Sequence, residues 1–283
     1  MNTFVLTALL IGAAAPQSAA PAPKTGASSP ELRLYTLDCG RIDFADEKTF
    51  SDTGEHDGER GVMPVSCFLI RHGREWLLWD AGLGDEIAAS PSGRMVVGLH
   101  FRVPVRLEAQ LAQLRVKPDD VRYVALSHLH ADHSGNVALF SRATFLVSPK
   151  ELAWASARPT PQGVRPDVVA VLSRSRVEPV DGDLDVFGDG TVRMIGTPGH
   201  TPGHHSLVVM LRKTGPVILS GDVAHFQVNY ERDLVPTGNV SRAETIASIG
   251  RIKGLAAHLH AKVVIQHAAG VFDELPASPA YLD

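Results

Sequence analysis

Residues 127–133 read Ser-His-Leu-His-Ala-Asp-His, and four of these seven side chains are of types that bind metal ions. The stretch follows an apolar run that is typical of a buried strand. Because residues two apart on an extended chain point to the same side, His128 and His130 can face one ion together. The chain then turns, and Asp132 and His133 project toward a second position beside the first. Imidazole and carboxylate together are the ligands that zinc prefers.

Three further ligand-type residues follow later apolar runs. His200 lies in a turn rich in glycine and proline, Asp222 follows the next buried run, and His267 follows the last one. Active sites at strand ends are the common arrangement in α/β folds. We therefore expect these three side chains to converge with the first four at one rim of a sheet.

The order of apolar and polar stretches predicts a single α/β domain over residues 31–283, with sheets inside and helices outside. The predicted strands are 32–38, 65–72, 75–80, 121–128, 143–148, 176–180, 184–187, 191–196, 206–211, 216–220 and 262–267. The predicted helices are 105–116, a helix that opens at 149, and 241–260, where Ser241 and Glu244 form a capping box. Residues 41–62 and 81–103 are predicted to be long loops, the second of them a candidate lid.

The first residues are typical of an export signal. An apolar run over 4–15 is too short to span a bilayer comfortably and is followed by small residues and prolines. We expect a signal peptide at 1–22, a linker at 23–30 and a periplasmic or secreted mature chain that is not inserted in a membrane. The alternative is a disordered or membrane-anchored N-terminus.

Charge and cysteine content limit the remaining options. A net charge of -4 provides no basic footprint for nucleic acid and no polybasic membrane patch. Cys39 and Cys67 both lie in apolar, strand-like stretches, which favours two buried thiols; a disulfide is the alternative if the chain is exported.

The chain resembles the metallo-β-lactamase superfamily, whose HxHxDH motif matches His128, His130, Asp132 and His133. The family's later His, Asp and His match His200, Asp222 and His267. The resemblance implies a four-layer αββα sandwich and two divalent metal ions, with zinc expected. It implies that His128, His130 and His200 hold one ion, that Asp132, His133 and His267 hold the other, and that Asp222 bridges them. By the same resemblance, Asp80 is a carboxylate that orients a metal-bound histidine.

Two adjacent cations lower the pKa of a bridging water, so that hydroxide becomes available near neutral pH. We expect this hydroxide to attack an electrophilic carbon or phosphorus, with Asp132 as the proton shuttle. The expected enzyme is thus a zinc-dependent hydrolase.

Several stretches resemble the N-acyl homoserine lactone lactonases, which are quorum-quenching enzymes that open the lactone ring. The matching stretches are LYTLDCG, MPVSCFLI, LLWDAGL, SHLHADHSGN, GTPGHTPGHHSL, LSGDVAHF and IQHAAG with PASPAYLD. The resemblance implies a small-molecule lactone or ester substrate. Some lactonases carry a tyrosine three residues after the bridging aspartate, where this chain has His225, which could donate a similar hydrogen bond.

Other activities on the same site stay open. A phosphotriester hydrolase or a thioesterase would use the same hydroxide, whereas a β-lactamase is disfavoured because the zinc β-lactamases lack a bridging aspartate where Asp222 stands. A metal-binding protein without catalysis would be expected to have lost some of the family's ligands, and this chain has lost none of the seven. The oligomeric state is left open between a monomer and a homodimer. Candidate residues for an acyl-chain contact are Met63, Met95, Val96, Leu99 and Phe101.

Overall fold

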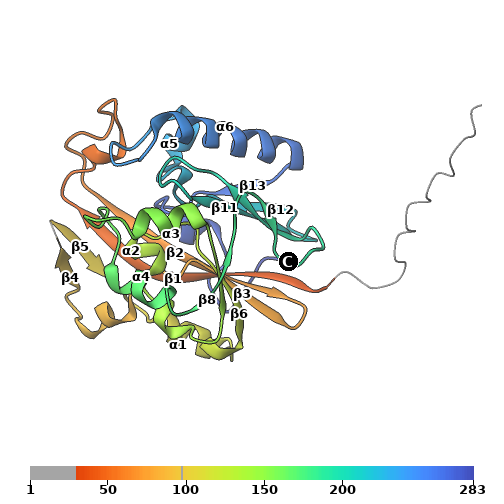
Figure 1. The fold of residues 1–283 in the computed structure, drawn as a ribbon. Coiled ribbons are helices and arrows are strands. Elements are labelled where there is room, and N and C mark those ends of the chain that lie inside the picture. Colours follow the sequence, from red (N-terminus) through yellow and green to blue (C-terminus); the bar gives the residue numbers. More distant parts are fainter. Residues whose placement is uncertain (1–29, 97) are drawn as a thin grey trace, which may run out of the picture. The chain divides into compact units, whose positions relative to one another are not determined.

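The computed structural model describes residues 30–96 and 98–283, which form two β-sheets packed face to face with helices on both outer sides (Figure 1). The expected signal peptide and nearly all of the expected linker lie outside the described residues. Within the described ranges, no helix combines the length and the apolar character needed to span a membrane.

The larger sheet has eight strands in the order β4-β5-β1-β2-β3-β6-β7-β8. Its strands are β1 (Leu32–Phe44), β2 (Gly61–His72), β3 (Glu75–Trp79), β4 (Arg94–Val96), β5 (Leu99–Arg102), β6 (Val121–Ala125), β7 (Thr144–Val147) and β8 (Arg176–Pro179). β2 and β3, which match the predicted strands 65–72 and 75–80, form a hairpin that closes with His72 opposite Glu75. The four neighbouring strands β3, β6, β7 and β8 are parallel, so their carboxyl ends share one edge of the sheet.

The smaller sheet has five strands in the order β13-β12-β11-β10-β9. Its strands are β9 (Leu184–Asp185), β10 (Val192–Gly196), β11 (His205–Met210), β12 (Pro216–Leu219) and β13 (Lys262–Val264). β12 and β13 are parallel, and the chain leaves both at the rim where β6 of the larger sheet also ends.

Short helices cover both outer faces, and the longest, α6, lies along the smaller sheet (Figure 1). The α-helices are α1 (Leu107–Gln113), α2 (Ala131–Ser134), α3 (Pro149–Ala155), α4 (Pro166–Leu172), α5 (Gln227–Arg232), α6 (Arg242–Leu259) and α7 (Val271–Glu274). The 3-10 helices are η1 (Lys48–Phe50), η2 (Asp85–Ala89), η3 (Pro118–Asp120), η4 (Val137–Leu139) and η5 (Gly221–Val223). Half of the predicted capping box of α6 is present: Ser241 Oγ accepts a hydrogen bond from the Glu244 amide, whereas the Ser241 amide donates to the Gly199 carbonyl.

Three apolar clusters separate the four layers. Between the sheets, Phe68 and Trp79 of the larger sheet pack with Leu207 of the smaller one. Leu111 of α1 belongs to the cluster on the outer face of the larger sheet, and Ile249 of α6 to that on the smaller one. Each fully buried side chain of this size stabilises the fold by about 1.5–3 kcal/mol. The expected αββα sandwich is therefore confirmed.

The long loop predicted over 81–103 is wrong in its second half. β4 and β5 form a hairpin there, and β5 extends the larger sheet by pairing with β1. Asp43 of β1 stabilises this edge, because its carboxylate accepts hydrogen bonds from Arg102 and contacts His100. β1 also continues to Phe44, six residues beyond the predicted strand end, since a bulge after Asp38 lets the pairing resume.

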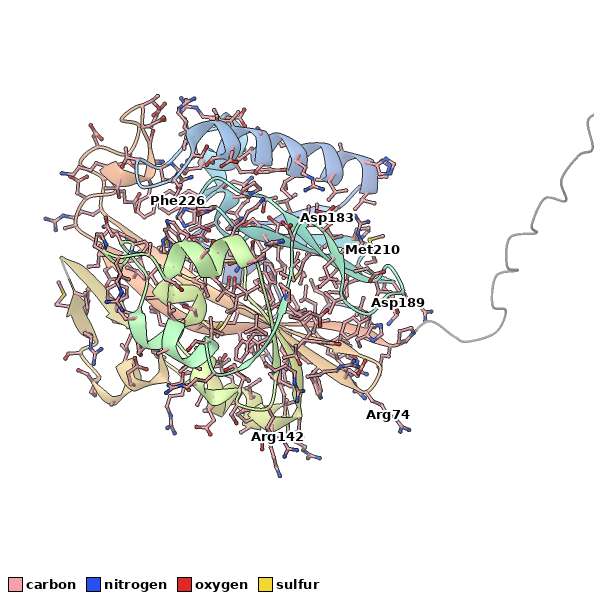
Figure 2. All side chains as sticks on the ribbon, in the orientation of Figure 1. Arg74, Arg142, Asp183, Asp189, Met210 and Phe226 are labelled. Atoms are coloured by element: carbon pink, nitrogen blue, oxygen red, sulfur yellow. A yellow bond between two sulfur atoms is a disulfide. The ribbon has the colours of Figure 1, made fainter. Side chains whose placement is uncertain are left out.

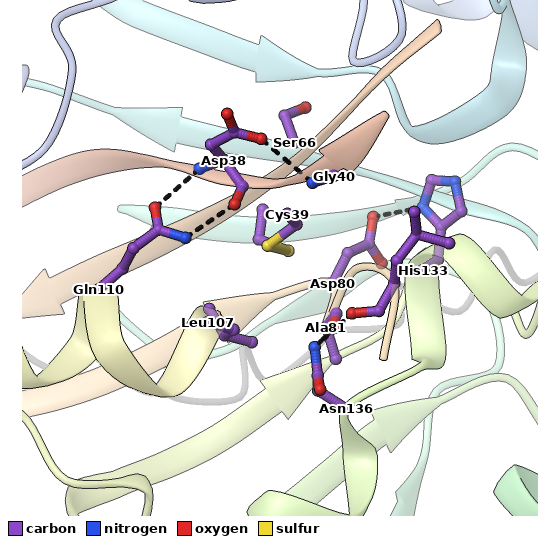
Figure 3. Close-up of a disulfide and its surroundings, with 12 residues drawn as sticks. Asp38, Cys39, Gly40, Ser66, Asp80, Ala81, Leu107, Gln110, His133 and Asn136 are labelled. Carbon is purple, nitrogen blue, oxygen red and sulfur yellow. Dashed lines mark hydrogen bonds and ion pairs between the residues drawn. A yellow bond between two sulfur atoms is a disulfide. The ribbon is translucent and has the colours of Figure 1, made fainter. Parts of the chain in front are cut away.

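Cys39 and Cys67 form a disulfide, so the favoured prediction of two buried thiols is wrong (Figure 3). The two Cα atoms are 5.8 Å apart, within the range that a disulfide spans. The cause is the bulge in β1, which places Cys39 beside its partner on the antiparallel strand β2. Sequence spacing alone does not reveal a bulge, and therefore did not reveal the bond.

The disulfide closes a loop between residues 28 apart in sequence, so removing it should lower the free energy of unfolding by about 3 kcal/mol. We expect the Cys39→Ala/Cys67→Ala variant to unfold at a lower urea concentration than the native chain. Reductant should lower the midpoint of the native chain but leave that of the variant unchanged. Two alkylatable thiols in the unreduced, unfolded native chain would contradict the bond.

Candidate metal centre

All seven predicted ligand residues come together at the rim where strands of both sheets end. His128 and His130 follow β6, and Asp132 and His133 lie on the single turn of α2. The other three follow β10, β12 and β13 in turn. The single turn of α2 begins at Ala131 and ends at Ser134. Two groups result, which consist of His128, His130, His200 and Asp222, and of Asp132, His133 and His267.

The first group is built from three imidazoles around one point. His130 Nδ1 lies 3.0 Å from His128 Nε2 and 2.9 Å from His200 Nε2. Asp222 Oδ2 lies 3.7 Å from His128 Nε2 and 3.5 Å from His200 Nε2. The three nitrogens and this oxygen therefore enclose a space of the size that one cation fills.

The second group contains two imidazoles and one further carboxylate. His133 Nε2 and His267 Nε2 are 3.0 Å apart, and Asp222 Oδ1 lies 3.1 Å from each of them. Asp132 Oδ2 is 3.7 Å from the first nitrogen and 3.6 Å from the second. Asp222 thus turns one carboxylate oxygen toward each group.

These residues fit two divalent cations. Asp222 Oδ1 is buried and makes no hydrogen bond, although a buried carboxylate oxygen normally has a partner. Around it, ring nitrogens face one another at hydrogen-bonding distance, and neutral imidazoles cannot all donate to each other. A cation in each group would satisfy these lone pairs, and the mixture of nitrogen and oxygen donors suits zinc.

Burial sets the charge of the first group. It lowers the pKa of His128 and His200 well below the ordinary value and that of His130 to about 4. All three imidazoles are therefore neutral near pH 7, which is the form that binds a metal ion.

The second group is different because carboxylates surround it. Burial opposes charge on His133, but Asp222, Asp80 and Asp132 outweigh burial and raise the pKa of this imidazole. His267 follows the same pattern, with Asp222 as the main cause of its raised pKa. Burial would also favour the neutral acid at Asp222, yet His133 and His267 hold its pKa well below the usual range. In the absence of metal, this group therefore holds protons near neutral pH.

Three of the ring nitrogens that face away from the two groups have partners of their own. Asp80 Oδ2 lies 2.9 Å from His133 Nδ1, a contact that Figure 3 shows. Asn239 Oδ1 lies 2.9 Å from His200 Nδ1, and the Pro64 carbonyl lies 2.7 Å from the Nδ1 of His267. Such partners fix the tautomer and the ring orientation of a ligating histidine.

Asp80 occupies this position with its backbone in the left-handed region, at φ 58°. It is fully buried, and its other oxygen accepts a 2.7 Å hydrogen bond from the Ser127 amide. A non-glycine residue with this φ is uncommon and persists where the surroundings over-determine it. The Asp80 carboxylate therefore contacts both His133 of the second group and the backbone at the start of the HxHxDH stretch.

Two residues that the sequence did not reveal, the buried Glu151 and the half-buried Asn239, hold the loops in place. Glu151 accepts hydrogen bonds from the amides of Leu129 and Gly203, each 3.0 Å long, so it ties together the loops that carry His130 and His200. Asn239, the partner of His200, lies in a loop without a recognisable pattern. No local signal marks either residue, because both act across distant parts of the chain.

His204 also contacts the centre, since its Nε2 accepts a 2.8 Å hydrogen bond from the Asp222 amide. Burial lowers its pKa to about 3, so the ring is neutral, and its Nδ1 faces the Thr197 carbonyl at 3.0 Å. His204 therefore helps to place the shared carboxylate.

His225 is buried beside the centre, with Nε2 3.2 Å from Asp222 Oδ2 and a buried Nδ1 that lacks a hydrogen-bonding partner. It packs against Phe50, which also packs against Phe226 at a ring distance of 4.9 Å; Figure 2 labels Phe226. Of the acyl-chain candidates, Met63 is buried in the core, whereas Met95 is 65% exposed.

A pocket of about 440 Å³ reaches the centre at His267. Its walls include Phe226 and the backbone turn after His267, and one side carries Glu47, His56 and Glu59. The ligand-type atoms of these last three residues lie within 4.8 Å of one another, so this side of the pocket is acidic.

Comparison with known proteins agrees with this geometry. Residues 60–267 match the family model described as the metallo-beta-lactamase superfamily. The chain is 31% identical to the N-acyl homoserine lactonase AttM of Azorhizobium caulinodans, an alignment that covers 89% of this chain and 99% of that protein. It is 28% identical to the N-acyl homoserine lactonase of Bacillus cereus over 78% of this chain and 87% of that one.

Among solved structures, an N-acyl homoserine lactone hydrolase with the product N-hexanoyl-L-homoserine at its catalytic metal centre superimposes with a TM-score of 0.78. It has 23% identity and covers 90% of this chain and 100% of its own. The dizinc quorum-quenching lactonase AidC has a TM-score of 0.66 at 17% identity, over 90% of this chain and 95% of its own. The fold, the convergent ligands and the family match lead to one conclusion: the chain belongs to the metallo-beta-lactamase superfamily.

Proposed function

We propose that the chain is a dinuclear-metal hydrolase that opens the lactone ring of N-acyl homoserine lactones. The observation that carries the proposal is the position of Asp222, which presents one oxygen to each of two groups of ligand-type side chains. The substrate follows from the similarity to AttM over nearly the whole length of both chains.

In this proposal, His128, His130 and His200 hold one zinc ion, Asp132, His133 and His267 hold the other, and Asp222 is shared. Two bound ions supply Lewis acidity, which makes hydroxide available near neutral pH and polarises the carbonyl of the lactone.

Residues of the chain would transfer the proton and donate a hydrogen bond to the carbonyl oxygen. The Asp132 side chain is 14% exposed, so a carboxylate oxygen can reach a water molecule at the mouth of the site. We assign to it the proton lost by the attacking water, which it returns to the ring oxygen when the ring C–O bond breaks. The products are a free carboxylate and a hydroxyl group on one opened molecule. We assign to His225 a hydrogen bond donated to the carbonyl oxygen, in which negative charge develops.

The acidic side of the pocket favours a neutral substrate. Glu47 and Glu59 lie on the wall beside His267, and an anionic thioester that entered there would meet like charge. A lactone or a phosphotriester carries no charge and would not be repelled, so the neutral phosphotriester is the alternative substrate that the test must include.

We also propose that the chain is exported to the periplasm or secreted. The Cys39–Cys67 bond supports this, because disulfides persist in oxidising compartments. Fractionation of the producing cells tests the proposal, and a chain found only in the cytoplasm with free thiols would contradict it.

Zinc-loaded protein should release protons when it is supplied with N-acyl homoserine lactones, because ring opening produces a carboxylic acid. We expect the metal-stripped protein to be inactive. Removing a residue that only hydrogen-bonds a metal ligand typically lowers activity roughly 10–100-fold. Asp222 is itself a proposed ligand of both ions, so the Asp222→Ala variant should lose more activity than that. A pH-stat assay with short-chain and long-chain lactones measures this. Turnover of phosphotriesters or thioesters but of no lactone would contradict the proposed substrate and leave only the metallohydrolase.

The His225→Phe variant should lower kcat by about 100-fold, since one donor to a developing oxyanion is worth about that much. The His225→Tyr variant keeps a donor and should retain more activity than the Phe variant. Tyr230→Phe, a change nearby on α5, is the matched control and should leave kcat unchanged. If the Phe and Tyr variants were equally active, the assignment of His225 as a hydrogen-bond donor would be wrong.

A further inference from the structure

Gln266, directly before His267, is fully buried and lies behind the second group of ligands. Its Oε1 accepts hydrogen bonds from Trp79 Nε1 at 2.7 Å and from the Gly221 amide at 2.8 Å. Its Nε2 donates to Asp80 Oδ2 at 3.1 Å. Because two N–H donors point at the same atom, that atom must be the amide oxygen, which leaves the NH₂ group facing the carboxylate.

Through these bonds and its own backbone, Gln266 reaches two ligands of the second group and the shared Asp222. The Asp80 oxygen that receives the amide is the same one that faces His133 Nδ1. The Gly221 amide immediately precedes Asp222, and the backbone of Gln266 itself precedes His267. One side chain therefore joins the supports of His133, Asp222 and His267, which come from both sheets.

The backbone of Gln266 is held as firmly as its side chain. Its amide donates to Ser220 Oγ at 3.2 Å, and its carbonyl accepts from Ser66 Oγ at 2.9 Å. The Trp79 indole that contacts Oε1 belongs to the core between the sheets. The position of the amide group is thus set by the packing of the two sheets.

We propose that Gln266 is a positioning residue that sets the affinity of the second ion, the one assigned to Asp132, His133 and His267. This inference rests on the metal assignment in the proposed function but not on the substrate. Only an amide meets the requirement, since the same group must donate to a carboxylate and accept from two N–H groups. A carboxylate at this position would face Asp80 with like charge, and an apolar side chain would leave the buried N–H groups of Trp79 and Gly221 unpaired.

The first ion has a separate support. His200 Nδ1 faces Asn239 Oδ1, and Asn239 Nδ2 donates to Thr245 Oγ1 on α6. None of these atoms contacts Gln266. A change at Gln266 should therefore lower the affinity for one ion, and a change at Asn239 should lower the affinity for the other.

The test is the zinc content of the folded chain after dialysis against buffers of graded free zinc, measured by mass spectrometry. For Gln266→Met and Gln266→Glu, we expect one of the two equivalents of zinc to bind roughly 10–100-fold more weakly, the range for loss of an outer partner, with the other unchanged. The Asn239→Ala variant is the matched control, and should weaken binding of the other ion alone. Thermal unfolding of each variant shows whether it is folded.

Wild-type affinity for both ions in the two Gln266 variants would overturn the inference. So would equal weakening of both ions, or failure of both variants to fold, because a general structural role predicts these results. A native chain that binds two ions but opens no lactone would contradict the proposed substrate and leave the role of Gln266 standing.

Discussion

The structure depends on the burial of Asp222 between two groups of ligand atoms. Its carboxylate and five surrounding imidazoles are almost entirely removed from water, and Oδ1 has no hydrogen-bonding partner. Burying unpaired polar groups costs several kcal/mol unless an ion or a hydrogen bond compensates. Two divalent cations would compensate for this cost, because they would bind the buried oxygen and nitrogen lone pairs. The proposed metal centre therefore explains why so many polar side chains are buried at this place.

The sandwich holds the ligands in place from outside. Each of several ligands is fixed by a partner from a distant part of the chain, such as Asp80 for His133 and Asn239 for His200. These partners come from strands and loops of both sheets, so the geometry of the centre requires the sheets to pack correctly. A change that loosens the packing of the sheets should therefore also disturb the ligand geometry. The left-handed backbone of Asp80 belongs to this arrangement, because it places the carboxylate beside His133.

The seven candidate ligands could be found from the sequence because each one follows an apolar strand, a pattern that is local. The layers could be predicted for the same reason. The disulfide could not, since it depends on a bulge after Asp38 that alters the register of β1. Glu151, Asn239 and Gln266 were also missed. Their contacts join residues that lie far apart along the chain, such as Gln266 with Asp80 and Trp79.

A calorimetric titration of the metal-free chain with zinc, repeated in buffers of different ionisation enthalpy, tests the dinuclear centre directly. We expect two ions per chain. Binding should release protons, because carboxylates raise the pKa of His133 and His267, whereas burial keeps His128, His130 and His200 neutral, so these three release none. Saturation at one ion per chain, or no binding, would contradict the dinuclear centre.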